Sequence, residues 1–267
     1  MYIKYVDDIL EVAYLAGEKI LEIYNSTGDI DVEYKKDNSP VTYADKEAHK
    51  IIQKNLEKIF SIPVLSEEGK DIPYNVRKHW EYFWLVDPLD GTKEFIKRNG
   101  EFTVNIALIH NSKPIFGVVY APAKNIFYFG GEELGSYKMS SGKKESLPST
   151  SQKESITVVV TKSHMNEETK EFLEKLKKHF GSINSISIGS SLKICLVAEG
   201  KADIYPRIGP TMEWDTAAAH AVLNAANGKI VKYNGEEIKN LYNLQELNYN
   251  KENLLNPYFI AFKKDVF

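Results

Sequence analysis

The chain has 267 residues, with 34 Lys and Arg against 37 Asp and Glu, which gives a formal net charge of −3. Hydrophobic residues make up 43% of the chain, enough for a sizeable core, which excludes a disordered or low-complexity protein. The charge balance leaves no basic field that would recruit nucleic acid or anionic lipid. A single cysteine, Cys195, permits no internal disulfide and favours a reducing cytoplasm.

Two amphipathic helices are the first elements predicted along the chain. Residues 3–24 carry apolar side chains at helical spacing, and interspersed charges argue against a signal peptide or a membrane span. Turn formers follow at residues 25–31, and a second helix is predicted from Ala44 to about Phe60, opened by a capping box. The residues expected on the inner faces are Ile3, Val6, Leu10, Ala13, Gly17, Ile20 and Tyr24, then Ala44, Ala48, Ile51, Ile52, Leu56 and Ile59.

The rest of the chain divides into two patterns. The first is a series of short apolar runs with hairpin-sized turns, which favours an antiparallel sheet; the runs are 62–65, 83–86, 103–109, 114–120 and 126–129. Residues 140–155 are polar and predict a surface loop or an inter-lobe linker. The second pattern alternates strands (156–160, 183–188, 202–205 and 229–232) with helices (167–180, 190–199 and 214–226). We therefore predict an α+β lobe over residues 1–150 and an α/β lobe over 151–267.

Residues 84–95 contain the strongest chemical signal. Asp87 and Asp90 lie three residues apart across a tight turn after a hydrophobic strand, so their oxygens can converge on one hard cation such as Mg²⁺. A helix predicted from Gly91 to Lys97 would present free N–H groups near Thr92, a cradle for phosphate. Together these features indicate metal-assisted phosphoryl transfer. The local spacing alone fits a plain Asp-Pro-x-Asp-Gly turn equally well.

Three further acidic residues lie at the ends of predicted elements. Glu67 follows a short strand, Asp45 lies in the first turn of the second helix, and Asp215 opens an alanine-rich helix. Taken singly, each is better explained as a capping or solvated residue. Four acidic sites at element ends, one beside a phosphate cradle, indicate a shared site when they are taken together.

These residues resemble a known family. Glu67-Glu68, the run Asp87–Thr92 and Trp214-Asp215 resemble the signature of the inositol monophosphatase superfamily of lithium-sensitive, magnesium-dependent phosphatases. Finer runs resemble its 3′(2′),5′-bisphosphate nucleotidase (CysQ-type) branch; these are residues 93–95, 189–193, 197–203, 205–207, 213–218, 254–257 and 259–261. The resemblance implies a layered sandwich of α+β and α/β parts with alternating α-β-α-β-α layers.

The resemblance also implies a set of two to three Mg²⁺ ions. Glu67, Asp87 and the carbonyl of Leu89 would hold the first ion, and Asp87, Asp90 and Asp215 would hold the second. Metal-bound water has a lowered pKa, and paired cations neutralise the attacking and leaving oxygens, so the implied site is chemically consistent.

The implied catalytic residues are Asp45, Glu67 and Thr92. A third, weaker ion would lie near Glu67 and Asp45, and Thr92 with either carboxylate would orient and deprotonate the attacking water. The backbone N–H groups of Gly91 and Thr92 would bind the phosphate. Cys195 lies within an apolar run, so we predict a core residue and not a nucleophile.

Two cationic residues favour a doubly phosphorylated substrate. Arg207 offers a cationic fork where the resemblance places an acidic residue in inositol monophosphatases, and Lys93 adds charge beside the phosphate cradle. Residues 189–191 and Lys193 are either nucleotide contacts or, equally, a helix start with a solvated lysine. The predicted substrate-binding set is Glu67, Leu89, Asp90, Gly91, Thr92, Lys93, Gly189, Ser190, Lys193, Arg207 and Asp215.

The function expected from the resemblance is hydrolysis of adenosine 3′,5′-bisphosphate to AMP and phosphate, in the recycling of nucleotides during sulfur assimilation. The alternatives are an inositol monophosphatase or broad sugar phosphatase, and a non-catalytic nucleotide-binding regulator. We expect a small-molecule nucleotide partner, no nucleic acid and no transmembrane segment. The expected location is cytoplasmic, with peripheral association with the inner membrane and a homodimer left open.

Overall fold

The computed structural model describes residues 2–26, 32–34, 40–149, 155–161 and 166–267. Its α-helices are α1 (Val6–Tyr24), α2 (Tyr43–Ile59), α3 (Tyr74–Arg77), α4 (Thr92–Ile96), α5 (Glu167–Phe180), α6 (Leu192–Glu199) and α7 (Ala217–Ala225). Short 3₁₀ helices are η1 (Tyr2–Tyr5), η2 (Pro122–Lys124) and η3 (Ile238–Asn243). In this described part of the chain, no helix combines the length and the apolar character needed to span a membrane.

The strands form two large sheets and one small pair. The seven-stranded sheet has the order β3-β4-β5-β6-β7-β8-β9; its strands are β3 (Val64–Ser66), β4 (Tyr82–Asp90), β5 (Thr103–His110), β6 (Lys113–Ala121), β7 (Ile126–Gly131), β8 (Gly135–Ser140) and β9 (Lys143–Ser146). The five-stranded sheet has the order β11-β10-β12-β14-β13; its strands are β10 (Ile156–Val160), β11 (Ile183–Ser187), β12 (Ile204–Arg207), β13 (Gly228–Lys232) and β14 (Phe259–Lys263). Strands β1 (Val32–Tyr34) and β2 (Pro40–Thr42) pair with each other.

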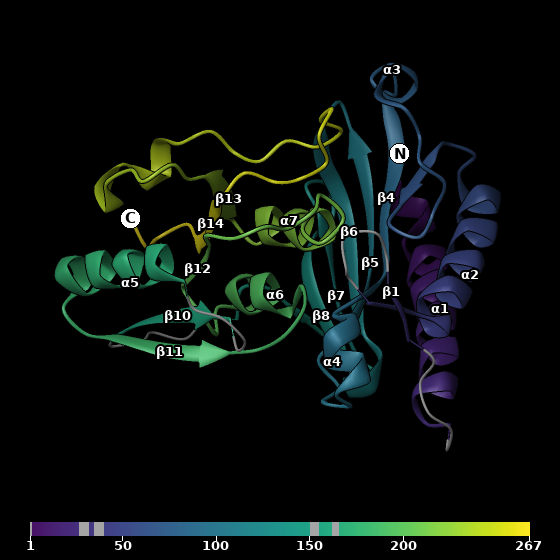
Figure 1. The fold of residues 1–267 in the computed structure, drawn as a ribbon, viewed down its shortest axis with the longest axis horizontal. Helices are drawn as coiled ribbons and strands as arrows, with labels where there is room; N and C mark the ends of the chain where they lie inside the picture. The colour runs from purple at the N-terminus through teal and green to yellow at the C-terminus, as the bar shows by residue number, and fades with distance from the viewer. Residues whose placement is uncertain (1, 27–31, 35–39, 150–154, 162–165) are drawn as a thin grey trace.

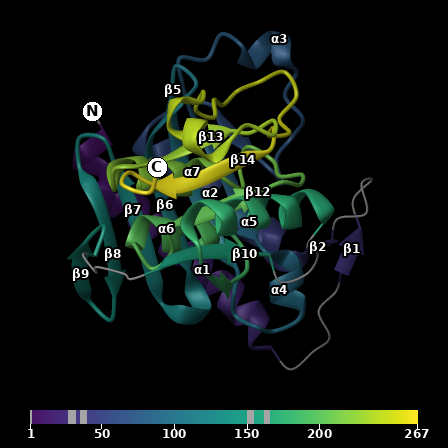
Figure 2. The same ribbon diagram turned by 90° about the vertical axis from the view of Figure 1, so that its left-hand side faces the viewer.

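Five layers follow one another along the long axis of the molecule (Figure 1). Helices α1 and α2 cover the outer face of the seven-stranded sheet, and α6 and α7 lie between the two sheets. Helix α5 covers the far face of the five-stranded sheet, as the turned view also shows (Figure 2). The predicted α-β-α-β-α sandwich is therefore confirmed.

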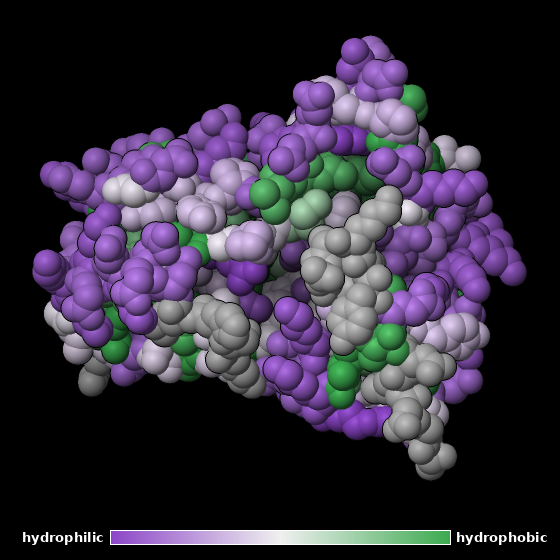
Figure 3. All heavy atoms as spheres, viewed as in Figure 1, coloured by the Kyte–Doolittle hydropathy of each residue, from purple (hydrophilic) through white to green (hydrophobic). Residues whose placement is uncertain are grey.

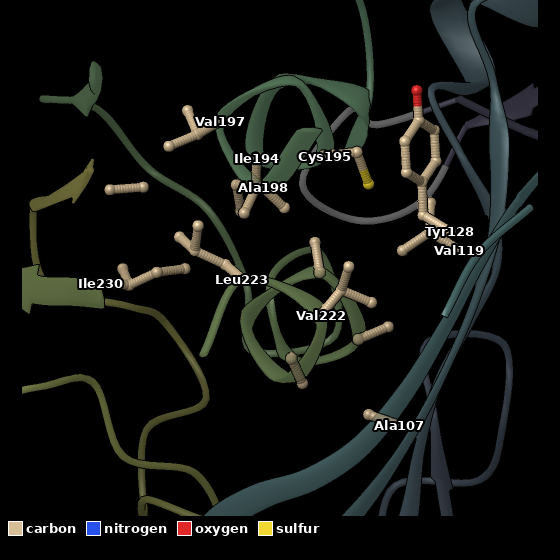
Figure 4. Close-up of a cluster of buried hydrophobic side chains, with 14 of the residues drawn as sticks. Ala107, Val119, Tyr128, Ile194, Cys195, Val197, Ala198, Val222, Leu223 and Ile230 are labelled. Atoms are coloured by element: carbon tan, nitrogen blue, oxygen red, sulfur yellow. The ribbon is translucent and has the colours of Figure 1, made fainter. Parts of the chain in front are cut away.

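Three apolar clusters hold these layers together. Alternate residues of a strand point to opposite faces, so Trp84 of β4 packs toward α1 and α2, whereas Leu85 packs toward α6 and α7. Figure 4 shows the middle cluster, where side chains of both central helices meet the seven-stranded sheet. Gly117 of β6 allows close approach of α7, because a Cβ there would lie 2.1 Å from the Ala218 carbonyl oxygen.

The antiparallel prediction is confirmed from β4 to β9, whereas β3 pairs with β4 in parallel. Within 140–155, the predicted loop is wrong for residues 143–146, which form the edge strand β9. All four of its side chains are exposed, so the strand carries no apolar signal. Residues 150–154, where the predicted lobes divide, lie outside the described residues, as do residues 27–31 of the predicted turn, and the lobe division stays a prediction.

Three smaller corrections concern helix starts. Ile3 is 44% exposed, because a 3₁₀ turn precedes α1 and buries Tyr2 in its place. Helix α6 begins at Leu192 and not at Ser190, whose positive φ of 53° is incompatible with a helical turn. Helix α7 likewise begins three residues after the predicted Trp214.

Candidate active site

Three carboxylates from distant parts of the chain converge between the layers. Strands β3 and β4 are parallel neighbours, so Glu67 follows the end of one strand beside Asp87 on the other, and the Glu67 amide donates to the Val86 carbonyl at 3.1 Å. Asp215 reaches the same point from the segment before α7, where its Oδ2 accepts from the Met212 amide at 2.9 Å. One ligand oxygen from each of Glu67, Asp87 and Asp215 lies within 4.8 Å of the others.

The electrostatics of this cluster favour a bound cation. Asp87 is only 2% exposed, and burial, reinforced by Glu67, raises its pKa well above the usual range. Burial, with Asp90 next, raises the pKa of Asp215 to about 8, and burial also raises the pKa of Asp45. Like charges held so close are unfavourable until a cation lies among them. The donors are all hard carboxylate oxygens, so these residues fit Mg²⁺ or a similar hard cation.

Asp90 is held in place by Asn105, which the predicted site did not include, and by Ser191, which was predicted only as one of two alternatives, a nucleotide contact or part of a helix start. Strand β4 shifts register between Asp87 and Asp90, and Asp90 Oδ2 accepts from both the amide and the hydroxyl of Ser191 at 2.5 Å. Asn105 Nδ2 donates to the Ser191 hydroxyl at 2.6 Å and lies 3.4 Å from Asp90 Oδ2. Asn105 is a polar residue inside the apolar run of β5, which is the signal that could have revealed it.

Removing the Ser191 hydroxyl is expected to weaken the site without removing a metal ligand. Asp90 is one of the predicted metal ligands. Loss of a partner that orients a ligating carboxylate costs about 10–100-fold in metal affinity or activity, and we expect Ser191→Ala to fall in that range. Ser191→Thr keeps the hydroxyl and is expected to restore part of the loss, whereas Ser182→Ala, at an exposed serine, serves as the matched control. Isothermal titration with Mg²⁺ measures the effect, and wild-type affinity in Ser191→Ala would contradict it.

A second group of predicted residues lies beside the carboxylate cluster. The Thr92 hydroxyl lies within donating distance of Asp45 Oδ1, at 3.2 Å, and of the Leu89 carbonyl, at 3.4 Å. Asp45 Oδ2 accepts from the amide and the hydroxyl of Thr42, at 2.8 and 2.6 Å, which orients the carboxylate. Gly91, with φ of +93°, makes the left-handed turn that starts α4, a conformation that glycine adopts readily.

A cavity of about 230 Å³ opens beside these groups. Its walls include eight of the predicted substrate-binding residues: Asp90, Gly91, Lys93, Gly189, Ser190, Lys193, Arg207 and Asp215. Glu67, Leu89 and Thr92 are not among its walls. In the space-filling view, hydrophilic side chains lie to the left of and below a hollow near the middle of the molecule (Figure 3).

Two cations of this cavity, Arg207 and Lys193, are each held by a backbone carbonyl. Arg207 Nη2 donates to the Pro210 carbonyl at 2.6 Å, and its charge lowers the pKa of Asp215 against the effect of burial. The Arg207 Nε is buried and has no hydrogen-bond partner among the described residues. Lys193 Nζ donates to the Ser190 carbonyl at 2.9 Å, so this lysine is bound at the helix start and not freely solvated.

Cys195 and His220 belong neither to the carboxylate cluster nor to the walls of the cavity beside it. Cys195 is a free, buried thiol whose pKa burial raises, which confirms it as a core residue. His220 is 1% exposed and packs against Tyr249.

The five layers and the buried acidic cluster define a class, that of layered α/β proteins with a carboxylate site between two sheets. Within that class the chain belongs to the inositol monophosphatase family, whose family model matches residues 4–261.

Curated relatives and solved structures agree with this assignment. The chain is 48% identical over 257 residues to the 3′(2′),5′-bisphosphate nucleotidase CysQ of Escherichia coli K12, covering 95% of this chain and 98% of that protein. It superposes on the crystal structure of CysQ from Bacteroides thetaiotaomicron with a TM-score of 0.88 and 46% identity, covering 99% and 98% of the two chains. An inositol monophosphatase from Thermotoga maritima, at 23% identity, TM-score 0.75 and 98% and 93% coverage, shares the fold.

Proposed function

We propose that this chain is a magnesium-dependent 3′(2′),5′-bisphosphate nucleotidase that converts adenosine 3′,5′-bisphosphate and water into AMP and phosphate. The observation that carries this proposal is the Glu67–Asp87–Asp215 cluster beside a cavity lined with cations. The relatives named CysQ, at up to 48% identity over nearly the whole chain, support the choice of substrate. Clearing the nucleotide by-product of sulfate activation is the corresponding cellular role. The cytoplasmic location, the membrane association and the homodimer stay predictions.

The residues that would hold two to three Mg²⁺ ions are Glu67, Asp87, Asp90, Asp215 and the carbonyl of Leu89. Bound ions would lower the pKa of the attacking water and neutralise charge on the phosphate. Each of these carboxylates is fixed by its strand, its turn or its hydrogen bonds, so the site is organised by the fold. That rigidity suits a reaction in which positioning and electrostatic stabilisation carry most of the catalysis.

The chain itself supplies a route for the proton of the attacking water. When the Thr92 hydroxyl donates to Asp45 Oδ1, its lone pairs can accept a hydrogen bond from water. As the water oxygen bonds to phosphorus and the bond between phosphorus and the 3′ oxygen breaks, the water proton passes to Thr92 while the hydroxyl proton of Thr92 passes to Asp45. The departing 3′ oxygen takes up a proton from solvent water. Burial raises the pKa of Asp45, which makes this carboxylate a better base than one in solution.

Arg207 is expected to recognise the phosphate group that is not hydrolysed. A hydrogen bond to a charged group contributes about 1.5–3 kcal/mol, so Arg207→Ala should reduce kcat/KM for adenosine 3′,5′-bisphosphate by roughly 10–100-fold. Activity on inositol 1-phosphate, which has no second phosphate, should change much less. Arg98→Ala, at an exposed arginine outside the cavity, is the control. Equal losses on both substrates would contradict this role.

The direct test compares phosphate release from adenosine 3′,5′-bisphosphate and from inositol 1-phosphate, with Mg²⁺ and with Mg²⁺ plus Li⁺. We expect fast, lithium-sensitive turnover of the nucleotide that disappears in Asp90→Asn, a variant that also controls for contaminating phosphatase. A preference for inositol 1-phosphate would overturn the proposed substrate. Absence of Mg²⁺-dependent turnover on both would overturn the proposed activity.

A further inference from the structure

Glu213, two residues before Asp215, is a fully buried carboxylate that lies outside the carboxylate cluster and does not line the active-site cavity. It accepts from the amides of Asn250 and Lys251, at 2.6 and 3.0 Å, and from the Lys251 ammonium at 2.5 Å. Asn250 has a left-handed φ of 65°, so two consecutive amides face one carboxylate, an arrangement typical of anion-binding turns. The buried charge of Glu213 is therefore compensated entirely by one loop.

This loop, residues 248–256, also holds the turn that carries Asp215. Asn256 Nδ2 donates to the Met212 carbonyl at 2.8 Å, before Asp215 in the chain, and to Thr216 Oγ1 at 3.1 Å, after it. The Met212 amide in turn donates to Asp215 Oδ2 at 2.9 Å. The turn is thus tied to the loop on both sides of the carboxylate that it presents to the cluster.

Arg77 connects the same loop to the part of the chain that carries the other two carboxylates of the cluster. It belongs to α3, within the connection from β3 to β4, and is 3% exposed. Its guanidinium donates to Asn250 Oδ1 at 2.9 Å and to the Lys251 and Glu252 carbonyls at 2.6 and 2.7 Å. Asn250 Nδ2 donates back to the Arg77 carbonyl at 2.7 Å. A continuous series of buried polar contacts therefore runs from α3 through the loop to Glu213.

We propose that Glu213 is a positioning residue for the metal-binding site, acting with Arg77 through the loop of residues 248–256. This inference rests on the metal-dependent activity proposed above. Among the three clustered carboxylates, that of Asp215 comes from the segment before α7, whereas the other two come from the adjacent strands β3 and β4. The distance between Asp215 and its partners depends on how this segment is held against the seven-stranded sheet. The contacts from Arg77 to Glu213 fix that distance without touching the metal.

Isothermal titration of the metal-free protein with Mg²⁺, in the absence of nucleotide, tests this role. Glu213→Gln keeps the size of the side chain but removes the charge that the loop surrounds. We expect it to weaken Mg²⁺ binding about 10–100-fold, the range for loss of a group that orients a metal ligand. Arg77→Met releases the loop from α3 and should weaken binding in the same direction. Glu171→Gln, at an exposed glutamate on α5, is the matched control.

Two further variants separate positioning from a general effect on stability. Leu176→Ala opens a cavity in the apolar cluster beneath α5, so it destabilises the fold but should leave Mg²⁺ affinity at the wild-type value. Asp215→Asn removes the ligand through which Glu213 acts and leaves Glu67 and Asp87 to bind Mg²⁺. In the Asp215→Asn background, adding Glu213→Gln should therefore weaken binding by less than about threefold, because the two effects are not independent.

Wild-type affinity in Glu213→Gln, or an equal loss in Leu176→Ala, would overturn the positioning role. A full 10–100-fold loss on adding Glu213→Gln to Asp215→Asn would also overturn it, because the effect would then not pass through Asp215. Absence of Mg²⁺ binding to the wild-type protein would overturn the metal site and the positioning role together. Because the titration contains no nucleotide, its result does not depend on which phosphate ester the protein hydrolyses.

Discussion

Asp87→Asn is expected to abolish turnover while making the metal-free protein more stable. The effect on activity should exceed the 10–100-fold that loss of an outer-shell partner costs, because Asp87 belongs to both predicted ion sites. The substitution removes the most deeply buried charge of the cluster, and the amide oxygen of asparagine can still accept from the Leu89 amide, which lies 3.0 Å from Asp87 Oδ1. Stability should therefore rise as repulsion with Glu67 and Asp215 disappears.

Urea unfolding in EDTA, together with steady-state kinetics in Mg²⁺, measures both parts of this prediction. Asp71→Asn makes the same substitution at an exposed aspartate and is expected to leave activity and stability near wild type. An Asp87→Asn protein that retains activity, or that is less stable than wild type without metal, would show that the cluster is not a site of electrostatic strain.

The metal-free protein is expected to lose stability as the pH rises from about 4 to about 8. Burial and the neighbouring carboxylates raise the pKa of Asp215 to about 8 and raise that of Asp87, so the folded chain binds more protons than the unfolded chain across this interval. Stability falls with rising pH wherever the folded state holds more protons. The two carboxyl groups contribute their full stabilisation below the pKa of an unfolded aspartate, near 4. This stabilisation is lost as the pH rises through their pKa values in the folded protein. At about 1.4 kcal/mol per pKa unit, the loss is on the order of several kcal/mol.

Magnesium should reverse the loss of stability with rising pH, because it binds the ionised carboxylates and stabilises only the folded chain. Denaturant midpoints between pH 5 and pH 8, measured in EDTA and in Mg²⁺, provide the comparison. We expect the two curves to diverge as the pH rises, and a smaller slope for Asp87→Asn in EDTA. A flat curve in EDTA would contradict the raised pKa values.

Local signals made parts of the fold predictable from the sequence. Helix α5 has the predicted bounds because Asn166 caps its start, accepting from the Thr169 amide at 3.0 Å, and Gly181 follows its end. Strand β10 also has the predicted bounds, because its run of β-branched residues is buried. Strand β14 was not predicted as a strand, since it follows a long irregular segment and its position is fixed only by pairing with β12 and β13.

The sequence predicted the carboxylates of the candidate site but not the residues that hold them in place. Glu67, Asp87 and Asp215 are acidic residues at element ends, a pattern visible along the chain, and the structure brings them together. The roles of Asn105 and Ser191 depend on a contact between residues 86 positions apart, which no local pattern contains.

The central claim is that water activated at the carboxylate cluster attacks the 3′-phosphate of a bisphosphate nucleotide directly. A single turnover of adenosine 3′,5′-bisphosphate by excess enzyme in H₂¹⁸O with Mg²⁺, followed by mass spectrometry of both products, tests it most directly. We expect one ¹⁸O atom in the released inorganic phosphate and unlabelled AMP that retains its 5′-phosphate. Unlabelled phosphate, adenosine 3′-phosphate as the product, or equal turnover in EDTA would contradict it.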